Sequence, residues 1–378
     1  MIYFDNASTS FPKAPGVSDC VKNFIDTSCF NINRGSYNLA LKATGIVYET
    51  REIIADFFGA SNPKNVIFTS GTTQSVNIAL NGLLNKGDKV ISSSMEHNAV
   101  YRPLENLRLK GVDTEYITFV SDTKKYLENF ETAVKNIKPK LVITTHASNV
   151  CGAIMPINEL GRICKENNVI FVVDAAQTSG VLDIDVKRDN IDILCFSGHK
   201  GLLSLPGVGA CVVTKNIAEI LKPFIFGGTG SFSHSAEMPS LLPDKFEAGT
   251  ANLVGIAAMQ ASINYIKNIG MNTIFNKEKE LQSYFEEKIK FISGVKIVGS
   301  NYKNRCPVSA LTFDNIDNAE VAYRLDDEYG IMVRSGLQCA PLAHKTLGTF
   351  PEGVVRFSFG HMNTIEETDI AVNAIKNL

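Results

Sequence analysis

The sequence contains no long hydrophobic run and no cluster of basic residues, and we expect no secretory signal. Its apolar stretches, such as Val169–Val173, are far shorter than the ~18–20 residues that span a bilayer. The net charge is −2, and without a basic cluster we expect no broad positive field that would bind nucleic acid or an anionic membrane. The N-terminus, MIYFDNASTS, has neither a basic segment nor a long apolar one. We therefore expect a cytoplasmic protein without a membrane or nucleic-acid partner.

The eight cysteines are scattered, and no two of them form a Cys-x-x-Cys pair. Zinc and iron–sulfur knuckles are therefore not expected, and no metal site is predicted. A disulfide framework is a poor interpretation for a chain of 378 residues without a secretory signal. Cys195 and Cys211 lie in the apolar stretches ILCF and ACVV, which is typical of small core residues. Cys339 differs, because it lies in a loop with polar flanks.

The glycine motifs of nucleotide-binding proteins are missing as well. Gly207 and Gly209 lack a third glycine and do not open the first strand–helix unit, so they do not support a dinucleotide site. No G-x-x-x-x-G-K-S/T segment occurs, which excludes a P-loop in its usual form.

An alternation of apolar strands with helical segments runs from about residue 17 to residue 253. Strands are predicted at Asn65–Ser70, Asp88–Ser94, Leu141–His146, Val169–Ala175 and Asp192–Gly198. Because helical patterns such as Thr73–Leu84 and Ile157–Asn167 lie between them, we expect an α/β fold with a mostly parallel sheet covered on both faces.

After Leu253 the pattern changes to longer helices, Val254–Asn268 and Met271–Ile292, and then to shorter β segments around residues 295–298, 308–313 and 354–359. This pattern is typical of a smaller α+β domain. We predict a large domain over residues 14–253 and a small domain formed by residues 1–13 and 254–378.

Polar motifs follow the five predicted strands: SGTT, MEHN, ASN, DAAQ and SGHK. Ligands of doubly wound sheets bind at this carboxyl edge. A protein that uses pyridoxal phosphate (PLP) needs an amine for its aldehyde, an acid for its ring nitrogen, donors for its phosphate and a flat group to stack on its ring. Lys200 is a candidate for the amine, although most lysines are solvated surface charges. Asp174 is a candidate for the acid, and a salt bridge or helix cap is the alternative.

The segment Ser70–Asn77 is a candidate for phosphate binding. Gly71 permits close backbone approach, and Thr72 and Thr73 offer hydroxyl and amide donors at the positive end of a helix. A simple N-cap is the alternative. His97 is either a satisfied core histidine or a ring that stacks on a cofactor.

Taken together, nine segments resemble the cysteine desulfurase family, a part of the class V aminotransferase group of fold-type I PLP enzymes. They follow in the family's order along nearly the whole chain: YFDNAST, FTSGTT, MEHN, SNVCGAIMPI, VVDAAQ, FSGHKG, FEAGT, RSGLQCAP and VRFSFGHMNT. The resemblance implies PLP as cofactor, a homodimer with shared active sites, and roles for individual residues. Lys200 would bond the cofactor, Asp174 would pair with its ring nitrogen, and Gln177 would reach its phenolic oxygen.

The resemblance assigns further positions in the same way. His97 would stack on the ring with Ala176 beneath it, and Asn149 would lie near the substrate. Thr250 would complete the phosphate site of the other subunit. The phosphate in the chain's own site would be held by Thr72, Thr73, Ser197 and His199.

The sulfur chemistry implied by the resemblance lies in the C-terminal part. Arg356 would bind the substrate carboxylate through its guanidinium fork, and a structural salt bridge is the alternative. Cys339 would accept the sulfur as a persulfide, giving L-alanine from L-cysteine, with His97 as proton shuttle. A nearby cation, Arg334 or His344, would favour the thiolate.

The short segment from Cys339 to Val354 resembles the family's second group, which includes selenocysteine lyases and depends on an acceptor protein. That group usually has histidine before the cysteine, where this chain has Gln338, a residue that can only hydrogen-bond. Selenocysteine lyase, another class V aminotransferase and a β-lyase therefore stay open as reactions. A sulfur carrier or scaffold with a vestigial cofactor site is the alternative from a different class.

Overall fold

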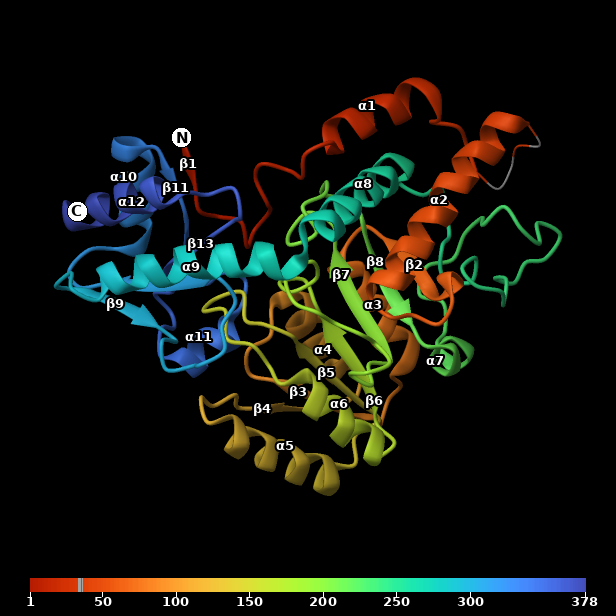
Figure 1. Cartoon of the computed structure of the whole chain (residues 1–378). Coiled ribbons are helices and arrows are strands. Elements are labelled where there is room, and N and C mark those ends of the chain that lie inside the picture. The colour runs from red at the N-terminus through yellow and green to blue at the C-terminus, as the bar shows by residue number, and fades with distance from the viewer. Residues whose placement is uncertain (33–34, 36) are drawn as a thin grey trace.

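The computed structural model describes residues 1–32, 35 and 37–378, and it contains a seven-stranded, a four-stranded and a two-stranded sheet (Figure 1). The strands are β1 (Ile2–Tyr3), β2 (Val66–Thr69), β3 (Lys89–Ser93), β4 (Asp113–Ile117), β5 (Leu141–Thr145), β6 (Ile170–Asp174), β7 (Ile193–Ser197), β8 (Gly209–Val213), β9 (Val295–Val298), β10 (Val308–Phe313), β11 (Ile331–Met332), β12 (Arg334–Gly336) and β13 (Val354–Ser358). The helices are α1 (Val17–Thr27), α2 (Asn38–Phe57), α3 (Thr72–Leu83), α4 (Asn98–Leu109), α5 (Thr123–Ile137), α6 (Ile157–Glu166), α7 (Lys215–Ile220), α8 (Leu253–Ile269), α9 (Met271–Ile289), α10 (Asn318–Tyr329), α11 (Pro341–Leu347) and α12 (Ile365–Lys376), with a short 3-10 turn at Pro63–Asn65.

The seven-stranded sheet has the order β2-β8-β7-β6-β5-β3-β4, which confirms the predicted α/β fold with a mostly parallel sheet. β8 is antiparallel to both β2 and β7, so β2 runs in the same direction as β7 and the parallel strands. The five predicted strands therefore end at one edge of the sheet. The edge strand β4 was not predicted, because its residues, DTEYI, are largely polar and only partly buried.

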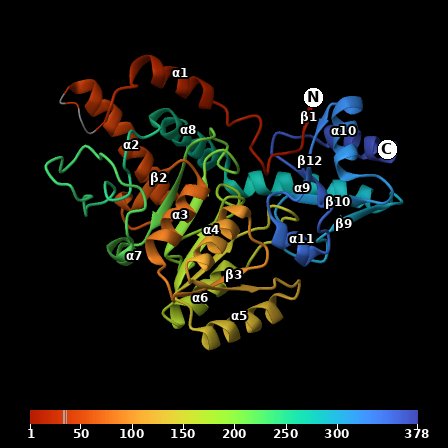
Figure 2. The ribbon, with the colours of Figure 1, turned by 180° about the vertical axis from the view of Figure 1, so that it is seen from behind.

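Helices cover both faces of this sheet, as Figures 1 and 2 show from opposite sides. Successive strand residues point to opposite faces. Val172 and Cys195 accordingly belong to the apolar core beneath α3 and α4, whereas Val173 and Leu194 belong to the core beneath α1, α2, α5, α6 and α8. Strands buried on both faces are apolar throughout, which is the pattern that made them predictable.

The four-stranded sheet is antiparallel and packs with α9, α10 and α12 around a core of its own. The N-terminal residues join this part, because β1 pairs with β11 and Asp5 forms a bridge with Ser358. These contacts place the first residues beside the four-stranded sheet. The division into domains of residues 14–253 and of 1–13 with 254–378 stays a prediction, and α8, which it assigns to the small domain, packs in the core of the seven-stranded sheet.

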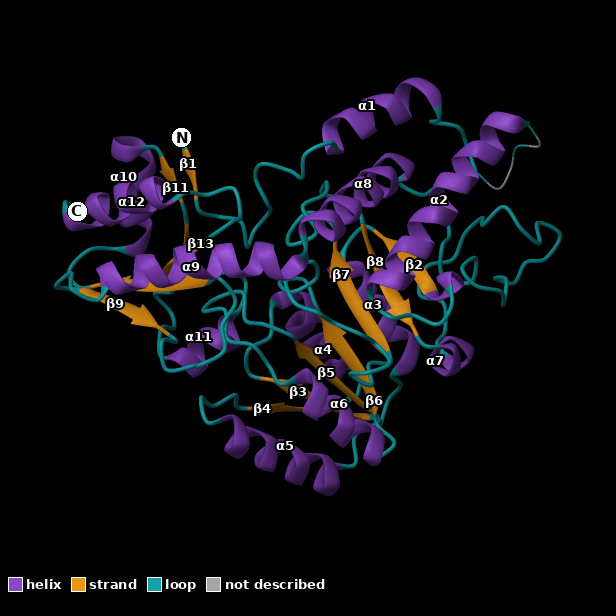
Figure 3. Ribbon diagram, in the orientation of Figure 1, coloured by secondary structure: helices purple, strands orange, loops and turns teal. Residues whose placement is uncertain are grey.

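Between α7 and α8, residues 221–252 form a long segment without helix or strand, which stands out from the body of the molecule (Figure 3). Among the described residues, no helix has both the length and the apolar character needed to cross a membrane.

Candidate active site

A cavity of about 240 Å³ lies at the carboxyl ends of the parallel strands, where they face the smaller part of the molecule, which is built around the four-stranded sheet. It brings together most of the predicted site residues, from both parts of the chain: Thr72, Thr73, His97, Asn149, Asp174, Ala176, Gln177, Ser197, His199, Lys200, Arg334 and Arg356. Ala7, Ser8, Ala99 and Thr145 complete the lining. Residues from distant parts of the chain therefore form one site at the sheet edge where ligands of such folds bind.

Lys200 and Asp174 form the charged centre of this cavity. Burial lowers the pKa of Lys200 to about 8; the Arg356 and Arg334 cations act in the same direction, and Asp174 opposes them. Burial raises the pKa of Asp174, against a hydrogen bond of 2.8 Å from Ala176 N and the charge of Lys200. A buried carboxylate of this kind is stable only with a cationic or hydrogen-bonding partner.

Ser197, Thr72 and His199 form a polar cradle at the start of α3. The Ser197 hydroxyl accepts from Thr72 N at 2.9 Å and lies 2.8 Å from the Thr72 hydroxyl. Gly71 has φ +147° and ψ −177°, a region that is essentially open to glycine alone. A Cβ at Gly71 would also lie 3.1 Å from Ser197 Oγ. Glycine therefore keeps this cradle open in front of the helix.

His97 caps α4, and its Nδ1 accepts a hydrogen bond of 3.0 Å from Ala99 N. Burial, with the charge of Lys200, lowers the pKa of His97 to about 4. The neutral ring then carries its proton on Nε2, so His97 presents a donor there. On another wall, Gln177 donates from Nε2 to the Ala7 carbonyl at 3.0 Å.

Arg356 is buried and already engaged within the chain. Its Nη1 donates to the Asn149 carbonyl at 2.9 Å, and its Nη2 donates to Ser8 Oγ at 2.7 Å and to Asp5. Its Nε has no hydrogen-bond partner among the described residues. The ion pair with Asp5 matches the structural alternative of the sequence analysis, so a substrate carboxylate would have to share or replace these acceptors.

Cys339 does not line the cavity, but its exposed thiol contacts a residue that does, because Sγ accepts a hydrogen bond of 3.3 Å from Arg334 Nη2. The expectation that His344 is a cation beside this thiol is wrong. His344 is buried, its Nδ1 lies 2.7 Å from the Thr349 hydroxyl, and burial lowers its pKa to about 4. His344 is therefore neutral near pH 7, and Arg334 is the cation that contacts Cys339.

Thr250 lies outside this site. It is exposed and lines a separate cavity of about 230 Å³ together with Thr69, Ser70 and Glu247. Its role toward a second subunit stays a prediction.

Two residues near the site were not singled out by the sequence analysis. Ser8 accepts from Arg334 at 3.1 Å as well as from Arg356. Glu96 is fully buried, accepts from Thr145 N at 3.0 Å, and has a pKa that burial raises to about 8. The sequence could have pointed to both residues, because they lie in motifs quoted above: Ser8 in YFDNAST, and Glu96 directly before His97 in MEHN.

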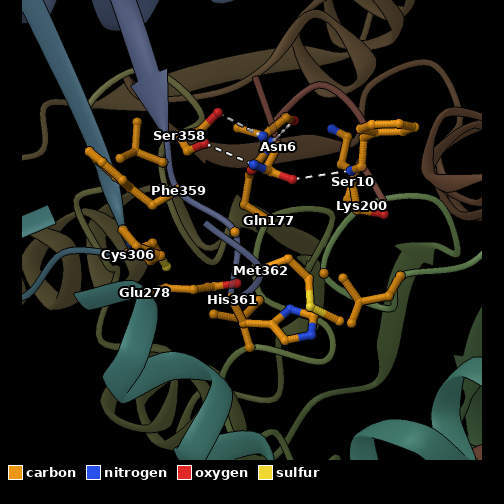
Figure 4. Close-up of a pocket in the computed structure, with 18 of the residues that line it drawn as sticks. Asn6, Ser10, Gln177, Lys200, Glu278, Cys306, Ser358, Phe359, His361 and Met362 are labelled. Carbon is orange, nitrogen blue, oxygen red and sulfur yellow. Dashed lines mark hydrogen bonds between the residues drawn. The ribbon is translucent and has the colours of Figure 1, made fainter. Parts of the chain in front are cut away.

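A second, smaller cavity of about 50 Å³ adjoins the first and shares Lys200 and Gln177 with it. Figure 4 shows Glu278, from α9, extending into it near Cys306 and His361. Burial raises the pKa of Glu278 to about 8. An acid of α9 thus lines a cavity that Lys200 also lines, and it is protonated at neutral pH.

Comparison with known proteins decides the family. The sequence model of "Aminotransferase class-V" matches residues 2–370. The chain belongs to the class V aminotransferase family. Within this family it is similar to a "Probable cysteine desulfurase" of Methanothermobacter thermautotrophicus and to one of Pyrococcus abyssi, each 33% identical over the whole chain and 94% of the relative.

Solved structures agree with this placement among the class V aminotransferases. The apo structure of a cysteine desulfurase from Thermococcus onnurineus superposes with a TM-score of 0.92 at 33% identity, covering 100% of this chain and 94% of that one. The Escherichia coli cysteine desulfurase CsdA has a TM-score of 0.87 at 24% identity, covering 99% of this chain and 94% of that one, and shows the shared fold. The chain is thus a member of the cysteine desulfurase family.

Class V aminotransferases depend on PLP, and the residues of the cavity fit it. Asn149 Oδ1, His199 Nδ1 and Arg356 Nε are buried and have no hydrogen-bond partner among the described residues. Leaving such an atom unpaired costs about 1–3 kcal/mol, so the cavity suits a polar ligand that pairs with them. The cradle kept open at Gly71, the Lys200 amine and the Asp174 carboxyl match the phosphate, aldehyde and ring nitrogen of this cofactor.

Proposed function

We propose that this chain is a PLP-dependent cysteine desulfurase that converts L-cysteine to L-alanine and leaves the sulfur as a persulfide on Cys339. One observation carries the proposal: Arg334 lines the cavity of Lys200 and Asp174 and also donates to Cys339 Sγ at 3.3 Å. The amine and the thiol therefore lie at one site, although they come from different parts of the chain.

The residues of the cavity divide into those for the cofactor and those for the substrate. Lys200 would bond the cofactor, Asp174 would pair with its ring nitrogen, and Gln177 would reach its phenolic oxygen. His97 and Ala176 would flank the ring, and Thr72, Thr73, Ser197 and His199 would hold the phosphate at the positive end of α3. PLP, when bound, withdraws electrons from the α-carbon of an amino-acid substrate.

Substrate binding involves the two arginines. Arg356 and Arg334 would hold the α-carboxylate beside Asn149, with Ser8 as the hydroxyl that links both guanidinium groups. Because Asp5 occupies Arg356 in the free chain, substrate binding would replace one carboxylate by another rather than fill an empty fork.

The sulfur step follows from the chain's own groups. Once the substrate amine has replaced it on the cofactor, Lys200 would take the α-proton of cysteine, and burial favours the neutral amine because it lowers the pKa of Lys200 to about 8. The Cys339 thiolate attacks the substrate sulfur, so that an S–S bond forms as the Cβ–S bond breaks. The electron pair of the broken bond passes to the carbon skeleton, so that Cβ gains a proton and becomes the methyl group of alanine, and Lys200 returns the α-proton to Cα. The proton that Cβ gains balances the one lost from the Cys339 thiol, and His97 on the cavity wall would relay it between the two groups.

The proposal includes a homodimer. Apolar side chains are exposed on α2 and on the neighbouring segment 221–252, among them Leu41 at 61% and Phe226 at 73%. Figures 1 and 2 agree that these two segments lie side by side. Exposed apolar surface of this extent is typical of an interface, and Thr250 at the end of the same segment would reach the partner's phosphate site.

The sulfur acceptor would be a separate protein. The short α11 region between Cys339 and β13 supports a place in the family's second group, in which the persulfide has to be collected from the enzyme. Cys339 is exposed, so an acceptor thiol can reach it without opening the cavity.

A Cys339→Ser variant tests the function. We expect it to lose alanine formation from cysteine, and mass spectrometry of the wild-type peptide to detect a persulfide on Cys339. A Cys29→Ser variant is the matched control, because Cys29 is exposed as well and should behave as wild type. Release of sulfide at the wild-type rate by Cys339→Ser would contradict the mechanism.

Two further measurements separate the alternatives. The purified protein should absorb in the visible range, and Lys200→Ala should abolish that absorbance, whereas a colourless chain that cannot be reconstituted would favour the scaffold. Rates with cysteine and selenocysteine, measured side by side, distinguish a desulfurase from a selenocysteine lyase.

A further inference from the structure

The loop that carries Cys339 has an unusual backbone. Gln338 and Cys339 have φ angles of +50° and +56°, so two consecutive residues with side chains occupy the left-handed region. Residues other than glycine rarely adopt this conformation, and they keep it only where surrounding contacts enforce it. The contacts that enforce it here determine where the Cys339 thiol points.

The Gln338 side chain supplies contacts from within the loop. It is 2% exposed, and its Nε2 donates to the Arg334 carbonyl at 3.0 Å and to the Gly336 carbonyl at 3.4 Å. These bonds fold the turn back onto β12, the strand that carries Arg334. The Gln338 Oε1 is buried and has no hydrogen-bond partner among the described residues. The side chain of Gln338 therefore holds the turn through its Nε2 group, which donates both hydrogen bonds.

Two bonds from outside attach the same turn to the cavity wall. Asn149 Nδ2 donates to the Gln338 carbonyl at 2.6 Å, and Asn98 N, at the start of α4, donates to the Cys339 carbonyl at 2.7 Å. Asn149 is itself a predicted site residue, whose carbonyl accepts from Arg356, and Asn98 directly follows His97. Hydrogen bonds to the carbonyls of both Gln338 and Cys339 therefore attach the turn to the site.

We propose that Gln338 is a positioning residue, whose side-chain amide locks the left-handed turn and holds the Cys339 thiol beside Arg334. The inference deepens the proposed function and rests on it for what Cys339 does. Leucine at this position would fill the space but donate no hydrogen bond, and glutamate would place a carboxylate against two carbonyls. Histidine keeps one ring N–H in its neutral form and would close the turn in part.

The experiment compares Gln338→Leu, Gln338→Glu and Gln338→His in the cofactor-loaded enzyme. In the Leu and Glu variants we expect faster hydrogen exchange in peptides covering residues 334–347. We also expect kcat for alanine formation to fall roughly ten- to a hundred-fold, because a displaced nucleophile reacts slowly. The visible absorbance should stay unchanged because Lys200 and Asp174 are untouched, and KM for cysteine should stay unchanged because Ser8 still holds the guanidinium groups of Arg334 and Arg356. Gln338→His should recover part of both losses, and Gln260→Leu on α8 is the matched control.

A double variant shows whether the residue acts through the thiol. On a Cys339→Ser background, Gln338→Leu should still speed loop exchange but have no further effect on turnover. The proposal is overturned if Gln338→Leu leaves loop exchange and kcat at wild-type values, or if KM rises instead of kcat falling. Failure of the proposed function would appear separately, as turnover that survives Cys339→Ser while the exchange of the loop still depends on Gln338.

Discussion

At the scale of single residues, Lys200 illustrates how the surroundings set reactivity. Burial lowers its pKa to about 8, with help from Arg356 and Arg334, so the amine loses its proton well below the usual range for lysine. A neutral amine is the form that attacks an aldehyde. The position of Lys200 therefore prepares it for bonding the cofactor.

The first prediction concerns the pH dependence of cofactor uptake. The rate at which apo protein gains visible absorbance with PLP should rise about ten-fold per pH unit below pH 8 and level off above it. Stopped-flow absorbance between pH 6.5 and 9.5 measures this. Nα-acetyl-lysine is the reference amine, and its rate should continue to rise above pH 9.

Asp174→Asn provides the matching variant. Asp174 raises the pKa of Lys200, so its removal should move the midpoint of the rate profile to lower pH. A wild-type midpoint above pH 10 would show that burial does not control this amine.

At the scale of elements, α9 carries a buried acid. Glu278 is 6% exposed, and burial raises its pKa from 4.5 to about 8. Between these two values the folded chain holds a proton that the unfolded chain has lost. Folding is then linked to proton uptake, so the contribution of this group to stability falls as the pH rises through the window.

The second prediction is that Glu278→Gln removes this dependence. The free energy of unfolding of the wild type relative to the variant should fall by about 1.4 kcal/mol per pH unit between pH 4.5 and pH 8, and stay constant at higher pH. Urea denaturation at pH 5, 6.5 and 8 measures it. Glu280→Gln, at an exposed position of the same helix, should follow the wild type. A stability difference between the wild type and Glu278→Gln that does not change with pH would contradict the assignment.

At the scale of the whole molecule, the exposed apolar side chains of α2 and of segment 221–252 support a homodimer. The third prediction is that the wild type has the mass of a dimer in solution. Phe226→Asp and Leu41→Asp should shift it toward the monomer, because a buried, unpaired carboxylate is costly at an interface. Light scattering coupled to size-exclusion chromatography measures the mass.

Phe291→Asp is the control for this prediction. Phe291 is 82% exposed and follows α9 on the smaller part of the molecule, so its replacement should leave the mass unchanged. A wild-type monomer that retains PLP and full activity would contradict both the dimer and the role of Thr250.

The sequence could predict those helices, strands and motifs whose pattern lies within a short stretch of the chain. Strands such as β6 are apolar because both of their faces are buried, and the polar motifs directly follow them in the chain. Lys200, Asp174 and Thr72 could therefore be assigned to one sheet edge. The weakly apolar strand β4 escaped prediction, since an edge strand is only partly buried and carries little periodic signal.

The amino-acid sequence by itself determined the α/β fold, the family and the placement of polar motifs at strand ends, because periodicity and motif order lie within short stretches of chain. Tertiary structure decided how distant groups pair. It engages Arg356 with Asp5, buries His344 in its neutral form, and holds Gln338 and Cys339 in a left-handed turn against Asn149. Charge state and thiol position depend on burial and on partners from elsewhere in the chain, and a local pattern contains neither.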